Sequence, residues 1–131
     1  MKPETDAFLR KARSFIAMAQ ELVGSGRWPE EAGRMAYLAT FHAAQAMLME
    51  VEGRRFKTHL GVHGAFASLV KDDPRFTAEQ KKLLGRTYEL KNTADYEIEA
   101  VDEITAEHAA DALAAARGFV ATVATVLEAE S

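Results

Sequence analysis

Two short stretches of the chain hold residues whose types and spacing could do chemistry. The first is the run Gly-Arg-Arg-Phe-Lys-Thr-His, in which Arg54, Arg55 and Lys57 precede His59. A helix start can bind a phosphate group, because free N–H groups and the positive end of the helix dipole converge there. Cations just ahead of the helix add to this attraction. If the chain binds a phosphate group, we expect the site at this corner.

The same region does not match the known motifs for metal ions or for phosphate-binding loops. His59 and His63 stand four residues apart, so both imidazoles share one face of a helix. A metal site also needs further ligands, and Leu60 stands where the glutamate of an HExxH motif would be. Gly53 and Gly61 match neither GxGxxG nor GxxxxGK[ST], which excludes those phosphate loops. We expect no metal ion and no other cofactor.

The second stretch is Tyr-Glu-Leu-Lys-Asn-Thr-Ala-Asp-Tyr, which ends at Tyr96. Lys91 and Asp95 are four residues apart and can pair along a helix, but the order of cation before anion is the weaker one. We therefore expect Asp95 or Tyr96 to have a partner elsewhere in the fold, such as His42 or the end of another helix.

His42 lies between Phe41 and Ala43 in an apolar segment. A buried histidine is usually hydrogen-bonded within the core, so a structural role is favoured over a catalytic one. The candidate ligand-binding residues are therefore Arg54, Arg55, Lys57, His59, His42, Lys91, Asp95 and Tyr96.

The element that must position these residues runs from Glu30 to Gly53 and is apolar on nearly every face. A helix that is apolar all round is buried. A bilayer-spanning helix needs ~20 predominantly apolar residues, and this segment carries Arg34, His42 and Glu50. The segment is therefore predicted to be the central helix of an all-α bundle without a membrane span.

Apolar residues that recur every three or four positions predict four more helices. Thr5 is expected to cap the first and Gly26 to end it, and Thr77 with Gln80 matches a capping box. These helices cover residues 3–24, the segment from Thr58 or His59 to just before Asp72, residues 77–96, and a segment that begins at Thr105.

The last of these helices has two apolar stripes, and the second consists of Ala112, Phe119 and Val126. A face this broad could contact both its own bundle and a second chain, which predicts a homodimer. The expected fold is a five-helix up-and-down bundle that forms a single domain over residues 1–131.

The composition narrows the function classes. Among 131 residues there is no cysteine, which excludes disulfides and thiolate metal sites and fits a reducing cytosol. The first residues lack the apolar core of a signal peptide, so we expect a cytoplasmic protein. The net charge of −4 means that any contact with nucleic acid is local.

Three local patterns together resemble the HEPN domain, in particular its small stand-alone bacterial and archaeal members. They are Ala-Tyr-Leu-Ala-Thr-Phe-His-Ala-Ala-Gln-Ala at residues 36–46, Lys-Thr-His-Leu-Gly-Val at 57–62, and Lys-Asn-Thr-Ala-Asp-Tyr at 91–96. The resemblance covers residues 8–127. It implies a five-helix bundle, usually dimeric, that binds nucleotide or RNA.

The resemblance also implies a second function class. Many HEPN proteins are ribonuclease toxins that pair with a small nucleotidyltransferase-like antitoxin and carry an Arg, four to six residues, then His. Arg54 and His59 meet this spacing, and in a metal-independent nuclease His59 would transfer a proton while Arg54 stabilised the phosphate. Arg55, however, follows Arg54 where the toxins carry a polar residue, and Lys91 stands where related members carry arginine.

Three hypotheses follow. The first is a noncatalytic homodimeric module that binds nucleotide, RNA or a partner. The second is a ribonuclease toxin that uses Arg54 and His59. The third is a structural interaction subunit beside a nucleotidyltransferase-like protein. The departures from the toxin motif favour the first.

Overall fold

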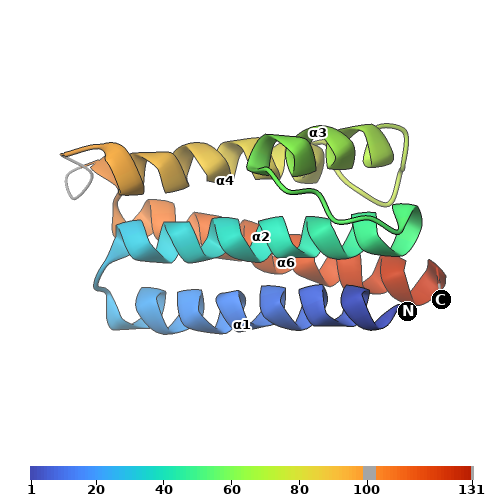
Figure 1. Cartoon of the computed structure of the whole chain (residues 1–131). Coiled ribbons are helices and arrows are strands. Elements are labelled where there is room, and N and C mark those ends of the chain that lie inside the picture. Colours follow the sequence, from blue (N-terminus) through green and yellow to red (C-terminus); the bar gives the residue numbers. More distant parts are fainter. Residues whose placement is uncertain (99–102, 131) are drawn as a thin grey trace.

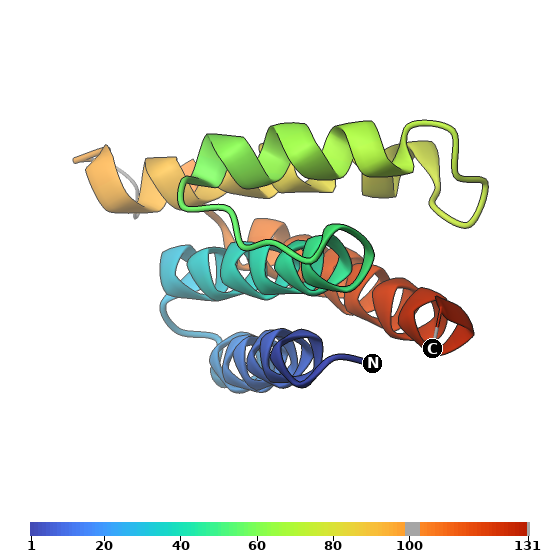
Figure 2. The ribbon, with the colours of Figure 1, turned by 45° about the vertical axis from the view of Figure 1, so that its right-hand side comes forward.

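The structure, a computed structural model, describes residues 1–98 and 103–130. Within these residues the chain forms helices and no strand, so the predicted all-α bundle is confirmed. Helices α2 and α6 lie side by side, with α1 on one side of them and α3 with α4 on the other (Figure 1 and Figure 2). The helices are α1 (Pro3–Ser25), α2 (Pro29–Glu52), α3 (His59–Val70), α4 (Ala78–Tyr96) and α6 (Ala106–Glu130).

The path of the chain places α3 over the middle of α2. The long helices α1, α2, α4 and α6 alternate in direction, whereas α3 runs in the same direction as α2 (Figure 1). The reason is the loop 53–58, which doubles back along α2 before α3 starts. As a result, the first turn of α3 faces the first half of α2.

Helix α2 is the central element, as predicted. It contacts α1, α3, α4 and α6. Its core positions are mostly alanines, which let neighbouring helices approach closely, and the large side chains Tyr37, Met47 and Leu48 fill the spaces between them.

The helix ends follow the expected local chemistry in all but one case. Gly26 and Gly53 have φ values of 69° and 70°, the left-handed conformation that ends α1 and α2. Thr77 and Gln80 form the predicted capping box. The prediction that Thr5 caps α1 is wrong: Pro3 starts the helix, and Thr5 is buried in its first turn, where its hydroxyl donates to Glu50.

Helix α6 uses both of its apolar stripes within its own bundle. Phe119 and Val126, from the second stripe, are buried, and Phe119 packs edge-on against Phe66 at 5.4 Å. Ala112, the third residue of that stripe, is half-buried. The homodimer stays a prediction. The helix is long and apolar enough to cross a membrane by length and composition, a test that core helices of folded proteins also pass.

Candidate functional site

A buried tyrosine hydroxyl joins α2 to the start of α3. Oη of Tyr37 lies 2.6 Å from Nδ1 of His59 and 2.9 Å from Nε2 of His63. Tyr37 is fully buried, and the two histidines present one face of α3 to it, as their spacing predicted. The Tyr37 hydroxyl group thus connects the two imidazoles.

Aromatic rings surround His59. Its ring centroid lies 4.6 Å from that of Phe41 and 5.6 Å from that of Tyr88, and Tyr88 also meets His63 edge-on. Burial lowers the pKa of His59, and the cation of Lys91 lowers it further. Burial and His59 likewise lower the pKa of His63. Both imidazoles are therefore neutral near pH 7.

Tyr37 keeps its proton in this environment. Burial raises the pKa of its hydroxyl above the ordinary value of 10.0, and the neighbouring Tyr88 raises it further. The phenol therefore remains both a hydrogen-bond donor and an acceptor.

The first turn of α3 has backbone donors to spare. Thr58 caps the helix, and its Oγ1 accepts from the N–H of Gly61 at 2.9 Å. Its carbonyl accepts from Val62. In the described part of the chain, the N–H groups of His59 and Leu60 bond to no protein group. They can donate hydrogen bonds to an anion, as expected for a helix start.

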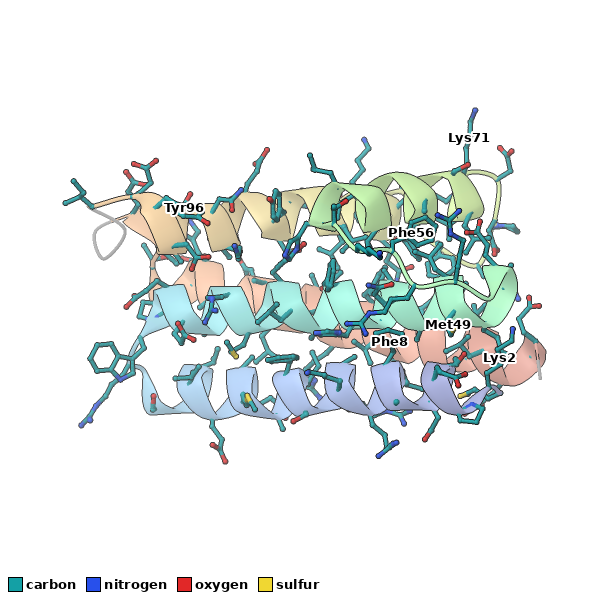
Figure 3. The ribbon with its side chains drawn as sticks, viewed as in Figure 1. Lys2, Phe8, Met49, Phe56, Lys71 and Tyr96 are labelled. Carbon is teal, nitrogen blue, oxygen red and sulfur yellow. The ribbon has the colours of Figure 1, made fainter. Side chains whose placement is uncertain are left out.

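The basic loop lies beside this turn, but Arg54 does not meet His59 in the described residues. The guanidinium of Arg54 lies 4.3 Å from the ring centroid of Phe56, and that of Arg55 lies 5.7 Å from the ring of Phe8. Phe56 is held between α2 and α3, and Phe8 between α1 and α2 (Figure 3). The two arginines are thus anchored on different sides of the loop, and Lys57 is exposed.

The second predicted stretch places a cation close to His59. Nζ of Lys91 lies 2.7 Å from Oδ2 of Asp95, so this predicted pair is present. Nε of Arg34, on α2, lies 3.4 Å from Oδ1 of the same carboxylate. The expected tertiary partner of Asp95 is therefore Arg34 rather than His42 or a helix end. Tyr96, at the end of α4, is 74% exposed (Figure 3).

His42 differs from expectation, since it is a packing residue whose Nδ1 is buried without a hydrogen-bond partner. Its ring stacks almost parallel on Phe15 at 5.4 Å. Burial, followed by the cations Lys11 and Arg55, lowers its pKa to about 4. The prediction of a hydrogen-bonded core histidine is wrong at this atom, because the rings packed around it belong to phenylalanines, which can neither donate nor accept a hydrogen bond.

The residues described hold no group of three or more histidine, aspartate or glutamate side chains placed to bind a metal ion. The site is instead a hydrogen-bonded tyrosine and two histidines, a helix start, and cations from α4 and the loop.

The chain matches the family model of the HEPN domain over residues 5–126. The protein belongs to the HEPN-domain family. Its fold is also similar to that in the crystal structure of TT1696 from Thermus thermophilus, with a TM-score of 0.74 over 95% of this chain and 98% of that chain, at 20% sequence identity. This likeness concerns the fold alone. No curated protein matches the chain.

Sequence reasoning missed two residues in the site of this HEPN domain. Tyr37 stands out in the sequence only as part of an apolar helix, although a buried tyrosine needs a hydrogen-bond partner. Arg34 stands out only as a polar residue of that helix, although it faces Asp95. Both lie on α2 within the first pattern that resembles the family or just before it, but their partners depend on how α3 and α4 pack.

Proposed function

We propose that this HEPN domain is a noncatalytic module that binds single-stranded RNA or a nucleotide by its phosphate at the start of α3. The observation that carries the proposal is the first turn of α3, where unpaired N–H groups adjoin His59 and follow the exposed cations of the loop 53–58. A phosphate group matches this combination of free donors and positive charge.

A longer ligand would have further contacts along the same face. Lys91 lies near enough to His59 to lower its pKa, and Nζ of Lys91 lies 5.5 Å from the ring centroid of Tyr96. Exposed aromatic rings beside cations stack bases without sequence preference. A single strand could therefore run from the loop past His59 and Lys91 to Tyr96.

The noncatalytic assignment rests on the positions of Arg54 and His59. Phosphate cleavage would need a cation where charge develops, opposite the base. The Arg54 guanidinium instead stacks on Phe56, and Nδ1 of His59 is occupied by Tyr37. The arrangement supports binding more than it supports proton transfer.

Binding of a labelled single-stranded oligouridylate tests the proposal. We expect a saturable shift that weakens in the double variant Arg54→Ala with Lys57→Ala, because both cations adjoin the α3 start. Lys82→Ala, which removes an exposed cation from α4, is the matched control. Absence of binding by the wild type at low salt, together with no thermal stabilisation by any mononucleotide, would reject the proposal.

The ribonuclease toxin is a second candidate, which the neutral state of His59 near pH 7 favours, since a neutral imidazole has one ring nitrogen without a proton and a general base needs such a nitrogen. Expression of the wild type would then arrest growth, and His59→Ala would relieve the arrest. Equal growth of the two strains would remove this candidate.

The remaining predictions concern partners and location. We also propose a homodimer, a nucleotidyltransferase-like protein partner and a cytoplasmic location. The family resemblance supports the first two, and the composition supports the third. Sedimentation equilibrium of the purified chain tests the dimer. Co-purification of a defined nucleotidyltransferase-like protein would favour a structural interaction subunit over an RNA-binding module.

A further inference from the structure

The Tyr37 hydroxyl restricts where the protons of two histidines can sit. It has one proton to donate and lone pairs that accept, and it faces Nδ1 of His59 and Nε2 of His63 at hydrogen-bonding distance. An imidazole nitrogen can face this hydroxyl either as an N–H donor or as a bare acceptor. A fully bonded hydroxyl therefore needs one donor and one acceptor.

Only two arrangements of the neutral rings meet this condition. In one, Tyr37 donates to Nδ1 of His59 and accepts from Nε2–H of His63, so that both rings carry their proton on Nε2. In the other, Tyr37 accepts from Nδ1–H of His59 and donates to Nε2 of His63, so that both carry it on Nδ1. Any mixed state leaves a buried polar atom unpaired, which is costly.

The distances from the Tyr37 hydroxyl to the two histidines favour the first arrangement, in which both rings carry their proton on Nε2. To an oxygen acceptor, bonds donated by a hydroxyl are about 2.7–2.8 Å long and bonds donated by N–H about 2.9–3.0 Å, so a hydroxyl donor gives the shorter contact. The contact to His59 is 2.6 Å and that to His63 is 2.9 Å. This difference favours the arrangement in which the hydroxyl donates to His59 and accepts from His63.

The charged and titratable groups around the rings leave this arrangement in place. From α4, Lys91 and Tyr88 face His59, and Lys91 is held by Asp95. From α2, His42 lies close enough for His59 to lower its pKa. Among the described residues, these contacts include no carboxylate next to His59 that could stabilise its doubly protonated form.

We infer that Tyr37 and His63 are positioning residues that fix His59 as the tautomer with its proton on Nε2, so that His59 donates a hydrogen bond to a phosphate oxygen. The phosphate rests on the proposed function, whereas the tautomer does not. A nitrogen that already carries a proton cannot act as a general base, so the same bond that positions His59 also keeps it from starting RNA cleavage.

Uptake of a proton follows from the same geometry. Nδ1 of His63 is the ring nitrogen that can take a proton without disturbing the bonds to Tyr37. If Nδ1 of His59 were also protonated, N–H groups of both histidines would point at the Tyr37 hydroxyl. The proton of that buried hydroxyl would then have no acceptor. The pair therefore takes up one proton, and His63 receives it.

Long-range ¹H–¹⁵N NMR spectra of the histidine rings test the inference directly. We expect Nε2 of both His59 and His63 to be protonated and Nδ1 of both to be bare at neutral pH, with one proton taken up on acidification. In Tyr37→Phe, which keeps the ring, the shifts of both histidines should move to the averages of exchanging tautomers, and each ring should titrate by itself. Tyr88→Phe, a matched loss of a hydroxyl from a ring that also contacts both histidines, should keep the wild-type pattern.

Two results would overturn the inference: a proton on Nδ1 of His59 in the wild type, or a Tyr37→Phe spectrum identical to the wild type. A rescue variant adds a second readout. His63→Gln retains an N–H that can donate to Tyr37 and should keep the His59 shifts, whereas in His63→Leu, which has no such donor, they should move. If Gln and Leu act alike, His63 is not a positioning residue.

Oligouridylate binding by the same variants separates this inference from the proposed function. We expect Tyr37→Phe to weaken binding about threefold, the loss of one ordinary hydrogen bond. If the wild type shows the expected tautomers but binds no RNA, the proposed function fails and the tautomer stands. If the wild type binds RNA and His59 carries its proton on Nδ1, the inference fails and the function stands.

Discussion

Oη of Tyr37 and Nδ1 of His59 lie 2.6 Å apart, although the two residues are 22 positions apart in the chain. The bond connects the middle of the bundle to the first turn of α3, where the chain presents its unpaired N–H groups. Removal of this hydroxyl should therefore affect both the stability of the bundle and the ligand site.

Tyr37→Phe should lower the free energy of unfolding by about 1–3 kcal/mol, because two partly buried histidine rings lose their shared hydrogen-bond partner. Urea unfolding followed by circular dichroism measures the change. Tyr88→Phe should cost less, since Tyr88 is only partly buried. Equal losses in the two variants would show that the hydroxyl of Tyr37 has no special role.

Lys57→Ala should weaken RNA binding and flatten its dependence on salt. When one lysine no longer neutralises a phosphate of a single strand, the slope of log K against log salt becomes shallower by about 0.7. Titrations of the oligouridylate at several salt concentrations give the slope, and Lys82→Ala should leave it unchanged. A Lys57→Ala slope equal to that of the wild type would place the phosphate elsewhere.

Asp95→Asn should tighten RNA binding, whereas Lys91→Met should weaken it. The Asp95 carboxylate neutralises Lys91 and Arg34, so its loss frees positive charge beside His59. Each change should be about two- to fivefold, the range expected for one ion pair at the protein surface. Changes of the same sign in both variants would contradict a ligand that runs past Lys91.

Acid should destabilise the protein through His42. The pKa of its ring is about 4 in the fold against 6.5 as an ordinary value, so the unfolded chain binds more protons between these values. The contribution of the neutral His42 ring to the free energy of unfolding is fully present above pH 6.5 and is lost as the pH falls from 6.5 toward 4. His42→Phe, which keeps the stacking on Phe15, should show a shallower fall of unfolding free energy over this interval. An identical fall in both proteins would assign the acid sensitivity to other groups.

The helices could be predicted because their signals are local. The apolar period, the glycines at 26 and 53 and the capping box of Thr77 each act within a few residues of chain. Thr5 shows the limit of such signals, because a threonine near a helix start also satisfies its hydroxyl by donating to a carboxylate 45 residues away.

The site was predicted only in part because its contacts cross between helices. His59 and His63 share a face by their spacing, and Lys91 pairs with Asp95 by theirs. No spacing reveals that Tyr37 lies beneath the histidines, since that depends on the return path of the loop 53–58. The same path separates Arg54 from His59, although only four residues stand between them in sequence.

The most direct measurement is incubation of the purified protein with labelled single-stranded RNA in EDTA, followed by a gel that resolves both cleaved RNA and retarded complex. Wild type, His59→Ala and Lys82→Ala would be compared after their helical content is shown to be equal. The account predicts intact RNA in every lane, a retarded band with wild type and Lys82→Ala, and a weaker band with His59→Ala. Cleavage by the wild type that His59→Ala abolishes would contradict it and make the protein a metal-independent ribonuclease.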